Sequence, residues 1–261
     1  MQLIDPYQFR DLCGSARSLA IVGNAPCILD WKNGARIEAA DLVVRFNRAR
    51  TAGMEEAIGS RTDVLFVNAA NSLAKAPPPD KLSRPKCLVC FVSPQGVKTF
   101  DVGPFREWAG DVPVLLSFGP DLLGLPAAAR QRPLTSGTYA LYTLTRLLDL
   151  ERLFVTGFTM FGAVAGGAGK YWDEPVPHAA VVHDLDHEAQ LFVALLNGFT
   201  GQLETTEEIV QLAAQNGVRL GAGDSAGRVA RPRALHKRIA EGLAWRVLRS
   251  GMALRRVADS K

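Results

Sequence analysis

The sequence lacks any apolar run long enough for a membrane helix, and its excess of positive charge is small. A transmembrane helix needs about 18 or more consecutive apolar residues, and the 261-residue chain has no such stretch. The first residues also lack the basic and apolar regions of a secretory signal, so we expect no signal peptide. A formal net charge of +4, with 48% hydrophobic and 21% charged residues, predicts a soluble globular protein with a large core.

Cysteine is also scarce. The chain has four cysteines, Cys13, Cys27, Cys87 and Cys90, and only the last two form a Cys-x-x-Cys pair. A zinc site of this type usually needs a second such pair, and positions three apart on an expected strand at 87–92 point to opposite faces. We therefore expect reduced cysteines in a cytoplasmic protein, and no metal site.

Two short apolar runs, at residues 19–22 and 41–46, each lead into a loop that contains an asparagine. Gly23 ends the first run, where it lets the backbone turn without a Cβ clash, and Asn24 follows; Asn47 follows the second run. Such runs predict neighbouring parallel strands, and open α/β sheets bind ligands at the carboxyl ends of their strands. The asparagines are either loop caps or a polar pair that binds a nucleotide, although the dinucleotide fingerprint G-x-G-x-x-G is absent.

Apolar runs and turn residues place the other elements. Further strands are expected at 62–68, 112–118 and 153–156, a helix at 6–17, a short crossover at 34–40 and a helical turn within 51–60. Thr205–Glu208 predicts a capping box for a helix that Gly217 ends, and 218–220 predicts an edge strand.

A second candidate site begins at Thr135, Ser136 and Gly137, which precede a helical stripe of leucines. The hydroxyls and backbone N–H groups would lie at the positive end of this helix, which accepts a phosphate or another anion. The alternative is an ordinary N-cap.

Polar residues gather again around Lys170 and around His183–Glu188. His183 and His187 are four residues apart, as on a zinc-binding helix, but H-D-L-D-H is not H-E-x-x-H. The segment is therefore a metal-binding patch, a solvated helix start with Asp186 as N-cap, or a catalytic site. The Gly/Ala-rich residues 159–169 could form a mobile lid.

The C-terminal tail differs from the rest of the chain. From residue 223 onward it has ten Lys or Arg against three acidic residues, and 232–261 predicts one or two basic amphipathic helices. This pattern is typical of a helix at the surface of an anionic membrane; the alternative is a helix packed on the domain. Because the basic surface is confined to this tail, we expect no nucleic-acid partner.

Several of these segments resemble the sialylmotifs of the animal-type sialyltransferases. VGNAP, AADLVVRFNRA and IGSRTD resemble the large motif, whereas PLTSGT, a helix and LFVTGF resemble the small motif. KYWDE resembles the third motif, with Lys170 in place of a histidine, and HDLDHE resembles the fourth. The motifs occur in the family's order between about residues 19 and 188.

The resemblance implies a fold and a reaction. The fold would be a single Rossmann-like α/β domain, a GT-A-like variant with a mostly parallel sheet, over residues 1–222, with a helical tail over 223–261. The reaction would be an inverting, metal-independent transfer of sialic acid from a CMP-activated donor to a glycan or glycolipid hydroxyl. The alternatives are a CMP-Kdo-dependent transferase, a nucleotide-binding protein without activity, and an unrelated cytidylyltransferase-like or oxidoreductase enzyme.

The resemblance also implies roles for residues. Nucleotide binding would fall to the loop after the first strand, the end of the second strand, the start of the later helix and the third motif: Gly23, Asn24, Ala25, Asn47, Thr135, Ser136, Gly137 and Tyr171. His183 would be the catalytic base, Glu188 would orient or tune it, and Lys170 would replace a histidine that contacts the leaving phosphate. His187 has no motif counterpart.

The family's disulfide is absent, because Leu19 and Leu150 occupy the aligned cysteine positions. An apolar pair could fill the same space in a reducing cytoplasm, so we expect these two side chains to lie close together. This departure suits a bacterial enzyme that builds lipopolysaccharide, lipooligosaccharide or capsule, in the cytoplasm or on the inner face of the membrane.

Overall fold

A single parallel sheet forms the centre of the structure. The computed structural model describes residues 1–68, 84–91, 102–117, 134–161, 170–171 and 183–220. The strands are β1 (Leu3–Ile4), β2 (Ser18–Val22), β3 (Leu42–Phe46), β4 (Val64–Asn68), β5 (Cys87–Phe91), β6 (Val114–Ser117), β7 (Arg152–Thr156) and β8 (Gln202–Thr205). They lie in the order β1-β6-β5-β4-β3-β2-β7-β8, and every pair is parallel. The predicted α/β class with a parallel sheet is therefore confirmed.

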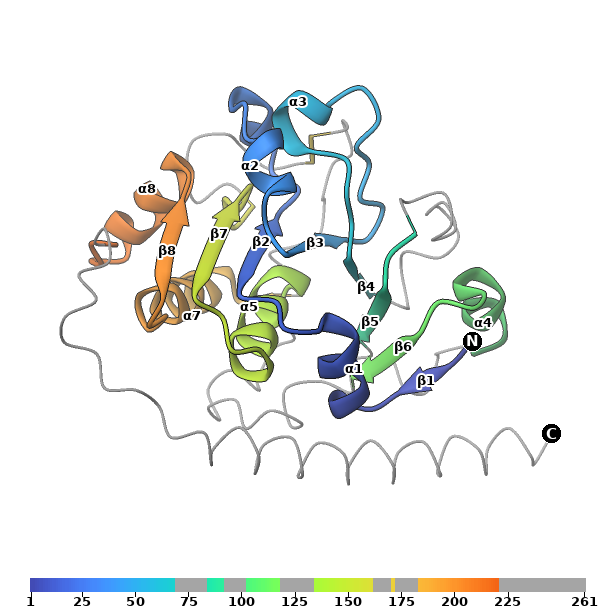
Figure 1. Cartoon of the computed structure of the whole chain (residues 1–261). Helices are drawn as coiled ribbons and strands as arrows, with labels where there is room; N and C mark the ends of the chain where they lie inside the picture. Colours follow the sequence, from blue (N-terminus) through green and yellow to red (C-terminus); the bar gives the residue numbers. More distant parts are fainter. Residues whose placement is uncertain (69–83, 92–101, 118–133, 162–169, 172–182, 221–261) are drawn as a thin grey trace.

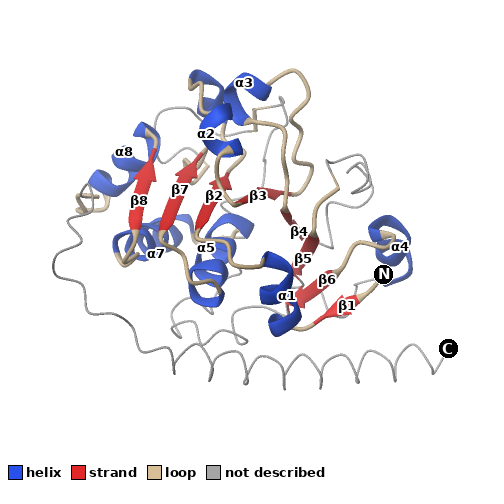
Figure 2. Ribbon diagram, in the orientation of Figure 1, coloured by secondary structure: helices blue, strands red, loops and turns tan. Residues whose placement is uncertain are grey.

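Helices cover both faces of this sheet (Figures 1 and 2). They are α1 (Pro6–Cys13), the 3₁₀ helix η1 (Pro26–Asp30), α2 (Gly34–Glu38), α3 (Glu55–Ile58), α4 (Val102–Ala109), α5 (Ser136–Leu147), α7 (Leu185–Asn197) and α8 (Glu207–Gln215). One apolar cluster joins α1, α5, α7 and α8 to one face, and two others join η1, α2, α3 and α4 to the opposite face. Cys87 and Cys90 lie in clusters on opposite faces, as the three-residue spacing predicts.

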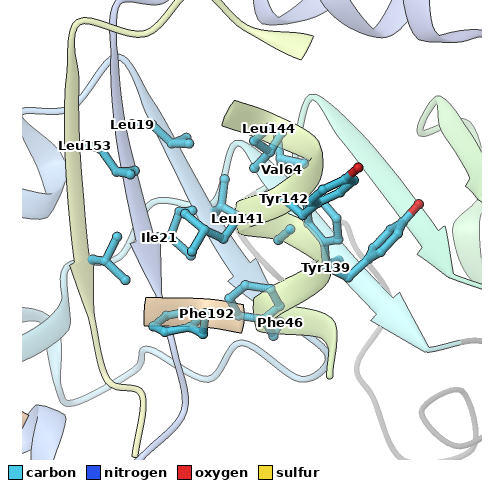
Figure 3. Close-up of a cluster of buried hydrophobic side chains, with 14 of the residues drawn as sticks. Leu19, Ile21, Phe46, Val64, Tyr139, Leu141, Tyr142, Leu144, Leu153 and Phe192 are labelled. Carbon is cyan, nitrogen blue, oxygen red and sulfur yellow. The ribbon is translucent and has the colours of Figure 1, made fainter. Parts of the chain in front are cut away.

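The larger cluster lies between the sheet and α5 (Figure 3). Ile21 of β2 and Leu141 and Leu144 of α5 are completely buried in it, together with Phe192 of α7. Burying an aliphatic or phenyl side chain of this size contributes about 1.5–3 kcal/mol. The packing therefore fixes α5 beneath the centre of the sheet and sets the position of its first residue.

The chain changes direction across the sheet at β2. Leu19 pairs with Leu42 of β3 on one side and with Leu153 of β7 on the other. After β2 the chain builds β3 to β6 on the first side and only later returns to add β7 and β8 on the second. The carboxyl ends of β2 and β7 thus flank a topological switch point, the place where open α/β sheets bind ligands.

Some local predictions are wrong. The capping box at Thr205–Glu208 does not form. Thr206 is the N-cap of α8 but makes no side-chain cap hydrogen bond, because its hydroxyl donates to Glu208 and lies 3.0 Å from the hydroxyl of Thr156. Residues 218–220 are not a strand; the edge strand is β8. The N-cap of α7 is Asp184 rather than Asp186, because Asp184 accepts the backbone N–H of His187.

Leu19 and Leu150 belong to the same region of the core. Leu19 is 1% exposed within the large cluster, and Leu150 is partly buried and packs against that cluster. The backbone N–H of Glu151, next to Leu150, donates to the carbonyl of Arg17 at 2.7 Å. The two segments are therefore adjacent, and direct contact between the two leucine side chains stays a prediction.

Two predicted features lie wholly or largely outside the described residues. They are the proposed lid, of which only 159–161 are described, and the basic tail. In the part of the chain that the structure does describe, no helix is long and apolar enough to cross a membrane.

Candidate active site at the carboxyl ends of β2 and β7

Two glycines bring the ends of β2 and β7 into direct contact. The N–H of Gly23 donates to the carbonyl of Thr156 at 2.8 Å, and the N–H of Ala25 donates to the carbonyl of Gly157 at 3.0 Å. A Cβ on Gly23 would lie 2.1 Å from the Gly157 oxygen, a distance that no real side chain reaches. Gly157 has a φ of +78°, which also favours glycine. The backbones can approach this closely only because both residues lack side chains.

The predicted asparagines lie at the same edge of the sheet. Asn24 donates its side-chain amide to the carbonyl of Phe46, at the end of β3, at 3.4 Å. Asn47 adopts a left-handed conformation with φ +56°, and its side-chain oxygen accepts the N–H of Asn68 at 3.2 Å. Each asparagine therefore links its own strand to the next. These contacts are those of loop caps, and they also place two amide side chains beside the switch point.

The start of α5 lies next to this edge. Thr135 is the N-cap, and its hydroxyl accepts the N–H of Thr138. Ser136 opens the helix, and a Cβ on Gly137 would lie 2.3 Å from the ring of Phe158, which follows Gly157. The N-terminus of α5 is thus packed against the end of β7. The positive dipole end of this helix favours an anion there.

Glu188 of α7 binds this helix start. One carboxylate oxygen accepts the backbone N–H of Thr135 at 2.8 Å and also accepts its hydroxyl. The other oxygen lies 4.0 Å from Nδ1 of His183. Glu188 is 2% exposed, and burial raises the pKa of its carboxyl. The fold therefore brings Thr135, which the sequence assigned to the small motif, together with His183 and Glu188 of the fourth motif.

Tyr171 connects the third motif to the Asn24 loop. Its N–H donates to the carbonyl of Asn24 at 3.1 Å, and its hydroxyl donates to the carbonyl of Arg50. The ring packs in the cluster on the α2 and α3 face, where burial raises the pKa of its phenol to about 12. The side chain is therefore a buried anchor. Lys170 precedes it and is half-buried, whereas Trp172 lies outside the described residues.

Contacts of Arg45 and Asp63 connect two parts of the segment that resembles the large motif. It is 1% exposed and donates to the carbonyls of Ile58 at 2.5 Å and Arg61 at 2.9 Å. Burial lowers the pKa of its guanidinium to about 10. Asp63 in turn accepts the N–H of Val43 at 2.8 Å. These buried polar contacts fix the β3 end to the following loop, so this part of the motif acts through structure.

Sequence reasoning missed Glu208. Its carboxylate accepts the N–H of Gly157 at 2.8 Å, so it contacts the turn that packs on Gly23. In the sequence, Glu208 stands three residues after Thr205, and this spacing predicted a helix cap. In the structure the side chain makes a tertiary contact instead. No pattern of local spacing could have shown that this side chain faces β7.

Metal-binding residues do not gather in the described part of the chain. No group of three or more His, Cys, Asp or Glu side chains lies close enough there to hold an ion. The four cysteines are all buried, and none of them forms a disulfide bond. His183 and His187, which the sequence allowed as a zinc pair, belong to no such group.

Comparison with known proteins finds a family that the first part of the chain resembles. The model of glycosyltransferase family 29 (sialyltransferase) matches residues 9–89. Sialyltransferase-like protein 2 of Oryza sativa subsp. indica is 42% identical over 64 residues, which are 23% of this chain and 16% of that protein. The CMP-N-acetylneuraminate-beta-galactosamide-alpha-2,3-sialyltransferase 1 of Mus musculus is 41% identical over 59 residues, 23% of this chain and 17% of that protein.

Another relative has a different name. A beta-1,6-galactosyltransferase of Arabidopsis thaliana is 36% identical over 52 residues, which are 20% of this chain and 13% of that protein. In each of these relatives the match therefore spans only a small part of the length.

Similarity in structure extends further along the chain. A mammalian sialyltransferase in complex with Gal-beta-1-3GalNAc-ortho-nitrophenol superposes with a TM-score of 0.53 at 21% identity, over 78% of this chain and 74% of that one. A second mammalian sialyltransferase structure gives 0.52 at 19% identity, over 74% of this chain and 70% of that one. Residues 9–89 thus resemble glycosyltransferase family 29 (sialyltransferase) in sequence, and the chain shares the fold of solved mammalian sialyltransferases.

Proposed function

We propose that the protein transfers sialic acid from a CMP-activated donor to a hydroxyl group of a glycan or glycolipid. The observation that carries this proposal is the contact of Glu188 with both Thr135 and His183, because it joins a nucleotide-binding helix start to a candidate base. The match of residues 9–89 to the model of glycosyltransferase family 29 supports the same reaction class.

The donor would bind at the switch point. It would lie between the loop of Gly23, Asn24 and Ala25 and the start of α5, where the CMP phosphate could use the backbone N–H groups and the dipole of that helix. Asn47 would reach the ribose or phosphate from the end of β3. Thr135, Ser136 and Gly137 would hold the cytidine side.

His183 would act as the general base. It takes the proton from the acceptor hydroxyl while that oxygen attacks the anomeric carbon and CMP leaves from the opposite face, which inverts the configuration. The Glu188 carboxylate, 4.0 Å from His183, stabilises the imidazolium that forms. Lys170 supplies a fixed positive charge for the leaving phosphate, and Tyr171 positions Lys170 through its own buried contacts.

We further propose that the reaction needs no metal, because a lysine and a helix N-terminus can stabilise the charge on the leaving CMP. Adding EDTA should leave the rate unchanged. A loss of activity that Mg²⁺ or Mn²⁺ restores would contradict this part of the proposal.

A galactosyl donor is a second candidate, favoured by the 36% identity with the beta-1,6-galactosyltransferase. CMP-Kdo remains an alternative as well, since Kdo shares the carboxylate and the quaternary anomeric carbon of sialic acid. A bacterial surface polysaccharide or lipooligosaccharide is the acceptor class that we propose.

Nucleotide release tests the function. The purified protein is given CMP-Neu5Ac, CMP-Kdo or UDP-galactose in parallel, each with and without a galactose-terminated acceptor, and released CMP or UDP is measured. Release from CMP-Neu5Ac alone supports the proposal. Release from UDP-galactose alone or from CMP-Kdo alone would show that this compound is the donor instead. Tight CMP binding without release under any condition supports a nucleotide-binding protein instead.

The tail and the location in the cell form a separate proposal. The basic amphipathic pattern of residues 232–261 supports contact with an anionic membrane, in a cytoplasmic protein held at the inner face. Full-length protein should sediment with phosphatidylglycerol vesicles but not with phosphatidylcholine vesicles. If protein lacking residues 232–261 sediments equally well, the tail is not the membrane-binding element.

A further inference from the structure

We infer that Glu208 is a positioning residue for the donor site, an inference that rests on the function proposed above. Glu208 lies on α8, 20 positions after Glu188, where the last of the family-like motifs ends. It is 4% exposed, and one carboxylate oxygen accepts the N–H of Gly157 at 2.8 Å. This contact reaches the turn that packs on Gly23 and Ala25 at the switch point.

The surrounding hydroxyl groups aim the carboxylate at this turn. Thr206 donates its hydroxyl to the same oxygen of Glu208 at 2.5 Å and lies 3.0 Å from the hydroxyl of Thr156. Thr156 is completely buried and Thr206 is 6% exposed. The start of α8 therefore uses its threonine and glutamate to hold the end of β7, whereas an ordinary helix start would use them to cap its own N–H groups.

Gly157 transmits this contact to the donor loops. Its N–H and the carbonyl of Thr156 belong to one peptide unit, in which Glu208 accepts the N–H and the carbonyl accepts the N–H of Gly23 at 2.8 Å. The carbonyl of Gly157, in the next peptide unit, accepts the N–H of Ala25 at 3.0 Å, and its oxygen is the atom that a Cβ on Gly23 would strike. The next residue, Phe158, presses its ring on Gly137 at the start of α5. This turn thus sets the spacing between the β2 loop and the α5 N-terminus, and Glu208 holds it from α8.

Stability alone gives little reason for this arrangement. The second oxygen of Glu208 has no hydrogen-bond partner among the described residues, and a buried, unpaired carboxylate oxygen is unfavourable for folding. A charged acceptor nevertheless holds an N–H more firmly than a neutral one does. The role of Glu208 is therefore to fix the geometry of the donor site rather than to stabilise the fold.

The test compares Glu208→Ala, Glu208→Gln and Thr206→Val with a matched control, Glu207→Gln, whose side chain is exposed on the same helical turn. Hydrogen exchange by mass spectrometry reports on residues 23–28, and calorimetry reports the Kd for CMP. Glu208→Ala should speed exchange in 23–28 but not in 42–46, and should weaken CMP binding by on the order of ten-fold, the usual cost of one charge-assisted hydrogen bond.

Glu208→Gln keeps an acceptor oxygen and should restore CMP affinity to within about two-fold of wild type. Thr206→Val keeps the shape of the side chain and loses the hydroxyl, so its CMP affinity should lie between those of Glu208→Ala and Glu208→Gln. The CMP affinity of Glu207→Gln should match that of wild type. If Glu208→Ala fails to fold, the same comparison is made with Thr206→Val.

The outcomes separate this inference from the proposed function. Unchanged exchange in 23–28, or faster exchange with unchanged CMP affinity, overturns the positioning role. If wild-type protein binds no CMP but Glu208→Ala still loosens 23–28, the proposed donor is wrong and the structural link from Glu208 to the β2 loop stands. Equal kcat with a raised donor KM in Glu208→Ala supports positioning rather than chemistry.

Discussion

Glu188 accepts the backbone N–H of Thr135 at 2.8 Å, although the two residues are 53 positions apart. Through this contact the start of α5 and the start of α7 form one unit, and His183 lies at its border. A carboxylate in this place can serve two neighbours at once. Changes at either end of the unit should therefore be visible in catalysis.

Replacing His183 with alanine should abolish transfer while CMP binding persists. A general base contributes about 10²–10⁴-fold to a rate, so kcat should fall by that order and the Kd for CMP should change little. His187→Ala is the control, because His187 lies one turn along α7 and has no role in the proposed reaction. If both histidine variants remain active, another residue is the base.

Glu188→Gln should separate stability from activity. Burial raises the pKa of the Glu188 carboxyl, so the charged form is disfavoured in the fold and its cost grows as pH rises above the unfolded value of about 4.3. The neutral amide avoids this cost. The variant should unfold at an equal or higher temperature at pH 8, and its relative advantage should vanish near pH 4.

The same variant should lose kcat by about 10–100-fold, because the imidazolium of His183 loses its nearby negative charge. Thermal melts at both pH values and steady-state rates measure the two effects. A variant that is less stable at pH 8 and fully active would contradict both expectations.

Gly23→Ala should disrupt the corner between β2 and β7. The new Cβ would lie 2.1 Å from a backbone oxygen that cannot move without displacing β7, so a loss of about 1–3 kcal/mol or more in unfolding free energy is expected. CMP binding should fall with it. Gly198→Ala, whose nearest backbone atom lies at 3.2 Å, should have a much smaller effect on both denaturation and binding.

The Asp41 carboxylate should stabilise the fold at neutral pH, and this stabilisation should be lost in acid. Its carboxylate accepts the N–H groups of Arg17 at 2.9 Å and Ser18 at 2.8 Å, and the first of these bonds is the largest cause of its lowered pKa. A lowered pKa gives stability that is complete above the unfolded value of about 3.9 and is lost as pH falls through the folded value. Asp41→Asn should therefore lower the melting temperature at pH 7.

The deficit of Asp41→Asn should narrow below about pH 4, where the wild-type carboxyl also becomes protonated. Melting curves between pH 3 and pH 8 measure it. Asp11→Asn, at an exposed position on α1, provides the control. A deficit that is constant across this range would show that the charge of Asp41 is not what matters.

Sequence patterns predicted the elements that local physics controls. The apolar runs that end at Gly23 and Asn47 are neighbouring parallel strands, and Thr135 is the N-cap of its helix. Both features could be predicted because runs of apolar residues and capping residues are short-range signals in the sequence. The edge strands β1 and β8 were missed. Each is short and carries no apolar run that could distinguish it from a loop.

Long-range contacts at the site could not be predicted in this way. The buried ring of Tyr171, the Glu188 contact with Thr135 and the Glu208 contact with Gly157 each join segments that are distant in the chain. Which acceptor a polar side chain finds depends on how the helices pack. The sequence assigned Thr135, Tyr171 and Glu188 to motifs and missed the role of Glu208, and only the fold shows which groups these side chains bind.

The position of β7 late in the chain has a consequence for biosynthesis. A ribosome produces β2 to β6 before it produces β7, yet β2 needs β7 as its second neighbour. Until residue 157 has left the exit tunnel, the nascent chain has no Gly157 turn to pack on Gly23. The proposed nucleotide site would therefore be completed late in synthesis, in the step in which β7 docks on β2.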